Sequence, residues 1–421
     1  MEQVRVCIVA DNASFRFGGE ASLPLHYFVR LRERGVEAWL ILHERTRQEV
    51  VQLLPWEQDR IFYLSDRWYH KALWRLSLLL PRRVAGATLG TVLVLINQAV
   101  QRRMLRRLIP KHGINLVHQP IPVSPKMPSL IAGLGVPVII GPMNGGMDYP
   151  PAFRRQESIF TQNFVRIGRS LSNLVNLFVP GKRRARILLV ANPRTKLALP
   201  HCPKAEVLEL PENGVDLKIW AQENETKDFQ PPASAKFIFA GRLVDWKRLD
   251  LVLDALASVE GAELEVIGDG AMHEPWEAHA RRLGISERVH FLGWLPQVAC
   301  ARRLRSSIAL VLPSIYECGG AVVLEAMAAG IPAIATAWGG PMDYLNEECG
   351  ILIEPISPEA MVKGFSEGMR KLMDDRELAA RMGAAGRRRV EAEFDWQKKM
   401  DRILEIYAQA LHQGTASPQA F

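Results

Sequence analysis

Residues 315–330 read IYECGGAVVLEAMAAG, and this stretch predicts a step from a buried strand, through a tight turn, into a helix. The apolar residues Val311 and Leu312 end the run before it, which is typical of a buried strand. Gly319 and Gly320 let the backbone turn sharply and approach a ligand, because neither carries a Cβ atom. The helix that follows should direct its first amides at an anion.

Two carboxylates flank this turn. Glu317 precedes the glycines, and Glu325 lies about one helical turn inside, on the same side as Ala321 and Val322. Backbone donors between two acidic side chains suit a phosphate ester with hydroxyl-rich groups on either side. A structural reading also stands, because strand–turn–helix steps occur in every open α/β sheet and a glutamate early in a helix can simply complement the helix dipole.

The bulk composition indicates a globular protein of two or three domains. The chain has 421 residues and a formal net charge of +8. The N-terminal half is basic, which suits an anionic membrane, a phosphate-bearing acceptor or nucleic acid. Five scattered cysteines without a CxxC spacing favour reduced thiols in the cytosol over a zinc site. The strand-like run Val4–Ala10 has no cationic leader, so no signal peptide is expected.

The N-terminal half should fold as a parallel, doubly wound sheet. Strands are expected at Val4–Ala10 and Val36–Leu42, with a helix at Ala21–Arg34 between them. The intervening loop lacks GxGxxG, so a dinucleotide site is poorly supported. His118 ends another expected strand, and Asn144 follows the next one, where ligands of such sheets bind. Asn144 could bind a sugar hydroxyl, while a single histidine at a strand end is also often a structural hydrogen-bonding group.

Residues 67–111 form the most unusual segment, with ten basic residues and no acidic one. Aromatic and leucine residues alternate with cations, and an apolar run from Val84 to Val100 follows. This run is short for a membrane span and contains polar residues. Two readings remain open: helices that lie on a membrane with their basic residues at the headgroups, or helices packed on their own domain with a solvated basic face.

The second half should start with a strand at Lys236–Ala240, followed by Arg242 and Lys247 in one strand-to-helix loop. Two cations there could neutralise a departing diphosphate, although charged loops of this kind are also common on surfaces. Further strands are expected at Glu263–Ile267, Arg288–Gly293, Ile308–Leu312, Pro332–Ala335 and Gly350–Ile353. Helices are expected at Pro358–Asp374, Arg376–Ala392 and Trp396–Leu411.

These motifs resemble those of the family 4 retaining glycosyltransferases of the GT-B fold. The glutamates at 317 and 325 match the glutamate-x7-glutamate motif, Arg242 with Lys247 matches the GR…K element, and residues 213–216 (NGVD) match the signature at the domain crossing. The sequence departs from the family at Gly319, where a phenylalanine is usual. Met342-Asp343 also replaces the usual glutamate of a later loop.

The resemblance implies an α/β GT-B architecture of two Rossmann-like doubly wound domains that face a deep interdomain cleft. Residues 1–212 would bind the acceptor, residues 213–395 the nucleotide sugar, and residues 396–421 would form a terminal helix crossing back. The implied catalytic residues are Glu317, His118, Arg242 and Lys247. The implied donor-binding residues are Gly19, Arg242, Lys247, Gly268, Gly319, Gly320, Ala321, Val322 and Glu325. The implied acceptor- or sugar-binding residues are Gly18, His118 and Asn144.

The predicted function is therefore a metal-independent retaining glycosyltransferase that uses a nucleotide-diphosphate sugar and a sugar or lipid-linked acceptor. No metal site or cofactor is expected, because Asp-x-Asp and clustered ligands are absent from the sequence, and protein cations would take the charge. Cytoplasmic location fits, with or without peripheral contact with an anionic membrane. Alternatives are a sugar-nucleotide 2-epimerase, a nucleic-acid-binding protein, for which no recognised module is present, and an inactive scaffold. The sequence leaves the base, sugar, acceptor and oligomeric state open.

Overall fold

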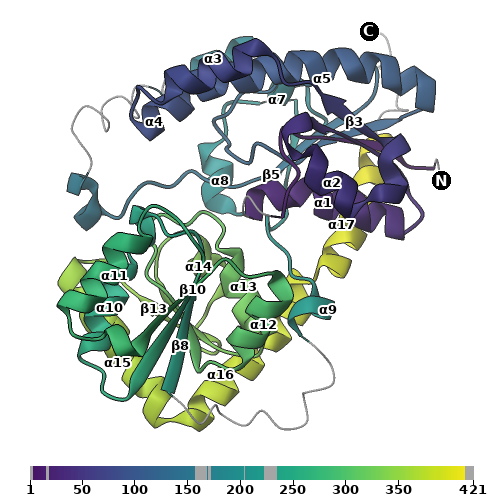
Figure 1. Ribbon diagram of the computed structural model, residues 1–421. Coiled ribbons are helices and arrows are strands. Elements are labelled where there is room, and N and C mark those ends of the chain that lie inside the picture. Colours follow the sequence, from purple (N-terminus) through teal and green to yellow (C-terminus); the bar gives the residue numbers. More distant parts are fainter. Residues whose placement is uncertain are drawn as a thin grey trace. The chain divides into compact units, whose positions relative to one another are not determined.

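The computed structural model describes residues 3–15, 19–156, 168, 172–202, 204–221 and 235–412 (Figure 1). They form two compact α/β units. Unit 1 comprises the described residues within Met1–Gly146, Glu157–Glu212 and Met400–Phe421. Unit 2 comprises those within Met147–Gln156 and Asn213–Lys399. These bounds differ from the predicted domains in that residues 147–156 belong to unit 2 and unit 2 extends to Lys399.

Unit 1 is built on a parallel seven-stranded sheet in the order β3-β2-β1-β4-β5-β6-β7. The strands are β1 Arg5–Val9, β2 Glu37–His43, β3 Ile61–Leu64, β4 Leu116–Gln119, β5 Val138–Met143, β6 Ile187–Val190 and β7 Glu206–Glu209. The helical elements are α1 Gly19–Glu33, η1 Glu44–Thr46, α2 Arg47–Leu53, η2 Pro55–Arg60, α3 Trp68–Ser77, α4 Arg82–Ala85, η3 Gly86–Gly90, α5 Thr91–His112, α7 Gly181–Arg184, α8 Pro193–Ala198 and the part of α17 Trp396–His412 from Met400 on. The inner strands are buried on both faces, which explains why they read as nearly continuous apolar runs.

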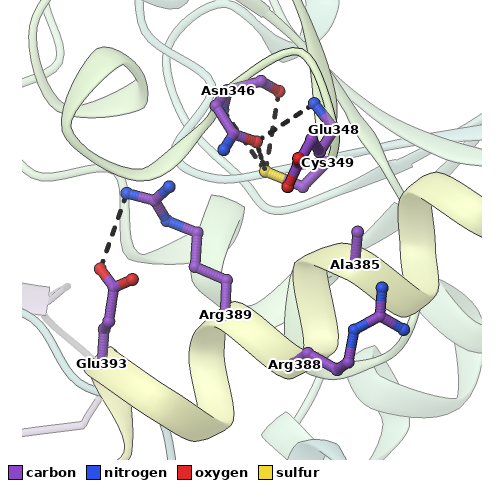
Figure 2. Close-up of a pocket in the computed structure, with 7 residues that line it drawn as sticks. All are labelled: Asn346, Glu348, Cys349, Ala385, Arg388, Arg389 and Glu393. Carbon is purple, nitrogen blue, oxygen red and sulfur yellow. Dashed lines mark hydrogen bonds and ion pairs between the residues drawn. The ribbon is translucent and has the colours of Figure 1, made fainter.

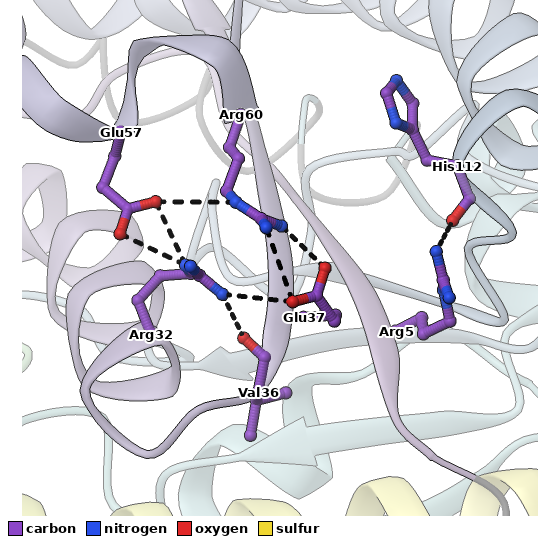
Figure 3. Close-up of polar contacts among 7 residues, drawn as sticks. All are labelled: Arg5, Arg32, Val36, Glu37, Glu57, Arg60 and His112. Atoms are coloured by element: carbon purple, nitrogen blue, oxygen red, sulfur yellow. Dashed lines mark hydrogen bonds and ion pairs between the residues drawn. The ribbon is translucent and has the colours of Figure 1, made fainter.

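Ion pairs tie the amino-terminal edge of this sheet together (Figure 3). Glu37, the first residue of β2, accepts a hydrogen bond from Arg60 at 2.8 Å. That bond from Arg60 lowers the pKa of the Glu37 carboxyl. Arg32 of α1 lies 3.1 Å from Glu57 and 3.6 Å from Glu37. Ligands bind at the opposite, carboxyl edge of such sheets, so we assign this cluster a stabilising role.

Unit 2 is built on a parallel six-stranded sheet in the order β10-β9-β8-β11-β12-β13. The strands are β8 Ala235–Ala240, β9 Ala262–Ile267, β10 Val289–Gly293, β11 Ala309–Leu312, β12 Ala333–Thr336 and β13 Gly350–Ile353. The helical elements are η4 Pro151–Gln156, α9 Leu217–Trp220, η6 Asp245–Lys247, α10 Leu249–Ala257, α11 His273–Arg282, η7 Ser286–Arg288, α12 Gln297–Arg305, α13 Ala321–Ala328, α14 Gly340–Tyr344, α15 Pro358–Asp374, α16 Arg376–Arg389, η8 Val390–Phe394 and the start of α17. The predicted α/β fold of two doubly wound parallel sheets is confirmed.

The strand order reverses direction between two central strands in each sheet. These pairs are β1 and β4 in unit 1 and β8 and β11 in unit 2. The loops that follow the two strands of such a pair run to opposite faces of the sheet. The space between these two loops can therefore hold a ligand. The loops after β8 and β11 contain Lys247 and Glu317, two of the predicted site residues.

The structure divides the basic segment 67–111 into two parts. Helix α5 packs on unit 1: Leu105 is fully buried, and Gln101 Nε2 donates to Ala10 O at 3.0 Å. For this part, the packed alternative is the one observed. Helix α3 instead keeps most of its side chains exposed. Among the described residues, no helix combines the length and apolar character needed to cross a membrane.

Candidate functional site

An ion pair joins the two loops at the reversal point of unit 2. Lys247 Nζ contacts Glu317 Oε2, and their side chains are only 12% and 15% exposed. Ile315 N also donates to Trp246 O at 3.0 Å, which fixes the loop after β11 against the loop after β8. The structure thus brings together two predicted site residues that are seventy positions apart in the chain.

Two glycines permit close packing of the loops at this edge of unit 2. Gly268, in the turn after β9, has a φ of 127°, and a Cβ atom there would lie 1.9 Å from Gly241 O. Gly320 has a φ of 74° and caps the amino terminus of α13, and a Cβ atom on it would lie 3.1 Å from Glu317 Cγ. Both positions therefore require glycine for the loops to lie where they do.

The start of α13 presents backbone donors beside the ion pair. Ala321 and Val322 are half-buried, and no side chain caps the helix. Gly340 N donates to Glu317 O at 2.7 Å, so the backbone that carries Glu317 is held on its other side by the start of α14. A rigid frame of this kind lets first-turn amides act on an anion without prior rearrangement.

Glu325 lies one turn inside α13, and burial raises the pKa of its carboxyl from 4.5 to about 7. Burial, followed by the charge of Glu325, raises the pKa of the Cys300 thiol to about 11. A carboxyl with a pKa near neutrality is partly protonated at physiological pH. A ligand that donates hydrogen bonds to its ionised form would draw it toward ionisation.

Arg242 is exposed, and its guanidinium makes no hydrogen bond or ion pair with any residue in the described part of the chain. It follows β8 directly and precedes Lys247 in the same loop. The cation is therefore available to an anionic ligand at this edge. Together with the α13 amides, Arg242 and Lys247 make the carboxyl edge of unit 2 suited to a diphosphate.

The predicted acceptor-side residues His118 and Asn144 lie in unit 1, and both are buried there. His118 is fully buried, with Nε2 donating to Gly141 O at 2.6 Å and Nδ1 accepting from the Tyr407 hydroxyl at 2.7 Å. Asn144 is 3% exposed and donates to Glu212 at 2.7 Å. These bonds favour the structural alternative for His118, whose two ring nitrogens are both engaged inside the unit.

Of the two glycines predicted in the first loop, Gly18 and Gly19, the structure describes only Gly19. Gly19 is exposed and begins α1. Gly18 lies outside the described residues.

Sequence reasoning missed Asp11, which follows β1 at the reversal point of unit 1. Burial raises the pKa of its carboxyl to about 6, against the opposing effect of nearby Arg45. Gln101 Nε2 donates to Asp11 Oδ1 at 3.0 Å. The only signal in the sequence was an acidic residue immediately after an apolar run. Its partner Gln101 lies ninety residues away.

A histidine cluster in unit 1 was also missed. Ligand atoms of His43, Asp66 and His70 lie within 4.8 Å of one another. However, His70 Nδ1 accepts from Arg67 N at 2.9 Å, so its Nε2 carries the proton and donates to Asn97 Oδ1 at 2.9 Å. A metal would need a lone pair on that nitrogen. We therefore interpret the cluster as a hydrogen-bonded anchor for α3.

A pocket of about 270 Å³ opens elsewhere on unit 2 (Figure 2). It is lined by Asn346, Glu348, Cys349, Ala385, Arg388, Arg389 and Glu393. Cys349 directly precedes β13, so the pocket lies by the amino-terminal end of that strand. Its walls carry both signs of charge, and Arg389 lies 3.6 Å from Glu393. None of the predicted site residues lines it.

Comparison with known proteins finds a family match in the second half of the chain. Residues 221–389 match the family described as glycosyl transferases group 1. This region is therefore similar to the group 1 glycosyltransferases. Curated relatives include a Mycobacterium tuberculosis glycogen synthase, 29% identical over 212 residues covering 49% of each chain. They also include a Streptomyces avermitilis D-inositol 3-phosphate glycosyltransferase, 33% identical over 188 residues covering 41% of this chain and 39% of the relative. The chain spans about half or less of the length of the curated relatives it matches.

Solved structures extend the likeness to the fold of the whole chain. A glycosyltransferase from Rickettsia africae has a TM-score of 0.70 at 15% identity, covering 99% of this chain and 100% of that one. Anabaena Alr3699/HepE, solved in complex with UDP-glucose, has a TM-score of 0.65 at 16% identity, covering 97% and 100%. At such identities the likeness establishes the fold, which is that of GT-B glycosyltransferases.

Proposed function

We propose that the protein is a retaining, metal-independent glycosyltransferase that moves a sugar from a nucleotide-diphosphate sugar to an acceptor hydroxyl. The observation that carries this proposal is the Lys247–Glu317 ion pair at the reversal point of unit 2. A cation and a carboxylate held together there can serve the two ends of one donor, namely its diphosphate and its sugar. The group 1 match over the same residues supports this reading.

Each site residue has a proposed role in the donor complex. Lys247 and Arg242 would receive the negative charge of the departing diphosphate, with the amides of Ala321 and Val322 as further donors. Removal of one donor of this type typically costs about 2.7–4 kcal/mol of transition-state stabilisation, so two cations with amides could replace a metal ion. Glu317 would hold hydroxyls of the sugar and stabilise positive character at its anomeric carbon.

The remaining proposed roles are those of Glu325, toward the nucleoside, and of the glycine turns, toward the phosphates. Glu325 would accept hydrogen bonds from the ribose hydroxyls in its ionised form. Gly268 and the Gly319–Gly320 turn would let the backbone approach the phosphates. In unit 1, Gly18 and Gly19 would let the first loop approach the substrates. Asn144 would form a hydrogen bond with a sugar hydroxyl.

Retention of configuration is proposed to follow from attack on the same face that the diphosphate leaves. The bond between the anomeric carbon and the phosphate oxygen breaks, and the diphosphate takes the electron pair. The acceptor oxygen bonds to the anomeric carbon from that face, and its proton passes to a phosphate oxygen. His118 would act only as a positioning residue, since both of its ring nitrogens are engaged inside unit 1.

The proposed role is in cell-surface polysaccharide or glycolipid synthesis at the cytoplasmic face of the membrane. Among the relatives is a lipopolysaccharide core biosynthesis glycosyltransferase, LpsE of Rhizobium meliloti, 28% identical over 179 residues covering 42% of this chain and 51% of that one. A hexose donor is proposed because Anabaena Alr3699/HepE, which has the same fold, was solved in complex with UDP-glucose.

The function is tested by incubating the full-length protein with UDP-, GDP- and ADP-sugars in EDTA, with and without candidate acceptors. The proposal expects one donor to be consumed, with the anomeric configuration of the donor kept in the product. Conversion of the donor at C2 without an acceptor would indicate the epimerase instead. Turnover that stops in EDTA and returns with Mg²⁺ would refute metal independence.

A further inference from the structure

Large apolar side chains are unusually exposed on α3 and the turn after it. Trp68 and Leu79 are each 79% exposed, Leu78 is 65% and Trp74 is 61% exposed. Leu76 and Leu80 extend the same surface. Figure 1 shows α3, α4 and α5 along one side of unit 1, and α3 packs on η3. We call Trp68–Leu80 the α3 surface. Single exposed leucines are ordinary, but a run of this kind marks an interaction site.

The inner side of α3 is firmly anchored, so the exposed residues cannot be explained by a loosely attached helix. His70 is buried, and its Nε2 donates to Asn97 Oδ1 of α5 at 2.9 Å. This bond holds α3 against α5, while the side chains of Trp68 and Trp74 stay exposed.

The charge of this surface indicates what could cover it. Lys71 and Arg75 are exposed on the same helix as the tryptophans. No acidic residue occurs from Arg67 to Lys111. Tryptophan prefers the boundary between headgroups and acyl chains, and lysine and arginine are attracted to anionic headgroups. Protein interfaces, by contrast, are depleted in lysine and in charge at their centre.

We propose that the α3 surface docks on an anionic lipid bilayer, with Trp68, Trp74 and Leu78–Leu80 in the interface and Lys71 and Arg75 at the headgroups. The helix would lie in the plane of the membrane rather than cross it. Helix α5 would remain part of the protein core. This surface lies in unit 1, and its binding does not depend on the activity proposed above.

The apolar part is tested by flotation of the full-length protein with phosphatidylcholine vesicles containing about one third phosphatidylglycerol. The variant Trp74→Ser/Leu79→Ser should bind at least tenfold more weakly than the wild type. The matched control Trp56→Ser/Leu197→Ser removes two apolar side chains that are 74% and 89% exposed elsewhere on unit 1. It should bind like the wild type, and all three proteins should share one melting temperature.

The electrostatic part is tested with Lys71→Glu/Arg75→Glu on the same vesicles. Each surface cation is worth about fivefold in affinity for an anionic bilayer, so the variant should lose at least about 25-fold. Binding of the wild type should also fall as salt is raised. Arg302→Glu, an exposed cation of α12, is the matched control and should leave binding unchanged.

Four results would overturn the proposal. The first is absence of wild-type binding to the anionic vesicles. The second is binding that the α3 variants leave unchanged, and the third is an equal loss in the controls. The fourth is a dimer in solution that Trp74→Ser/Leu79→Ser dissociates, since the α3 surface would then be covered by a second copy of the chain. Loss of donor turnover with intact vesicle binding would contradict only the proposed function.

Discussion

The Lys247–Glu317 ion pair can be tested by a double-mutant cycle with Lys247→Met and Glu317→Gln. Both replacements keep the approximate length of the side chain and remove its charge. With the side chains 12% and 15% exposed, the pair is closer to a buried pair than to a surface pair. Loss of one partner from a buried pair costs about 3–5 kcal/mol, and exposed pairs contribute about 0–1 kcal/mol. We expect each single variant to lose about 2 kcal/mol of local stability.

The double variant should be less damaged than the sum of the singles, because neither charge is then left without its partner. An expected loss of about 1 kcal/mol in the double variant gives a coupling free energy of about 3 kcal/mol. Hydrogen exchange followed by mass spectrometry measures this in peptides covering β8 and β11, with peptides of unit 1 as an internal reference. Purely additive losses, or singles that exchange like the wild type, would refute the reasoning.

Activity should not follow stability in this cycle. The double variant recovers stability but lacks both the cation and the carboxylate of the site, so transfer should stay reduced by about 100- to 1,000-fold or more. Recovery of transfer together with stability would mean that the pair is only structural.

Three further predictions concern pH, His118 and metal. Burial raises the pKa of the Glu325 carboxyl from 4.5 to about 7, so the folded protein holds this proton more tightly than the unfolded chain does. The stability that the bound proton contributes is therefore complete below pH 4.5 and is lost as the pH rises through 7. Thermal melts should therefore show the wild type losing up to about 3 kcal/mol relative to Glu325→Gln over that range, and a flat difference would contradict it. His118→Ala should lower the free energy of unfolding, measured with denaturant, by about 2–4 kcal/mol. The substitution leaves a cavity at a buried site and removes the partner of the Tyr407 hydroxyl. Donor affinity, measured by calorimetry, should not change. EDTA should change the turnover number by less than about twofold, because protein cations would receive the leaving charge, and restoration of lost activity by Mg²⁺ would show otherwise.

The fold and the unit 2 site were predictable because their signals are local. Apolar runs followed by glycine turns specify buried parallel strands and their carboxyl ends. Once strands precede both Lys247 and Glu317, sheet topology alone places the two residues at one edge. Hence the meeting of Lys247 with Glu317 at one edge of unit 2 could be inferred before any coordinates.

The unit 1 residues were harder because their partners are distant in sequence. Tyr407, which binds His118, lies 289 residues away, and no local pattern reports it. Likewise, the spacing of apolar residues does not say what a helix packs against, so α3 and α5 could not be told apart. His70 and its hydrogen bond to Asn97 separate the two helices only in three dimensions.

The central claim is that unit 2 binds the diphosphate of a nucleotide sugar through protein cations. Isothermal titration calorimetry of the full-length protein in EDTA, against UDP-, GDP- and ADP-sugars, tests it most directly. The account predicts that one class binds the wild type and binds the Lys247→Met/Glu317→Gln variant at least tenfold more weakly, although this variant loses only about 1 kcal/mol of stability. Equal affinity of the two proteins for that donor, or no binding without added metal, would contradict it.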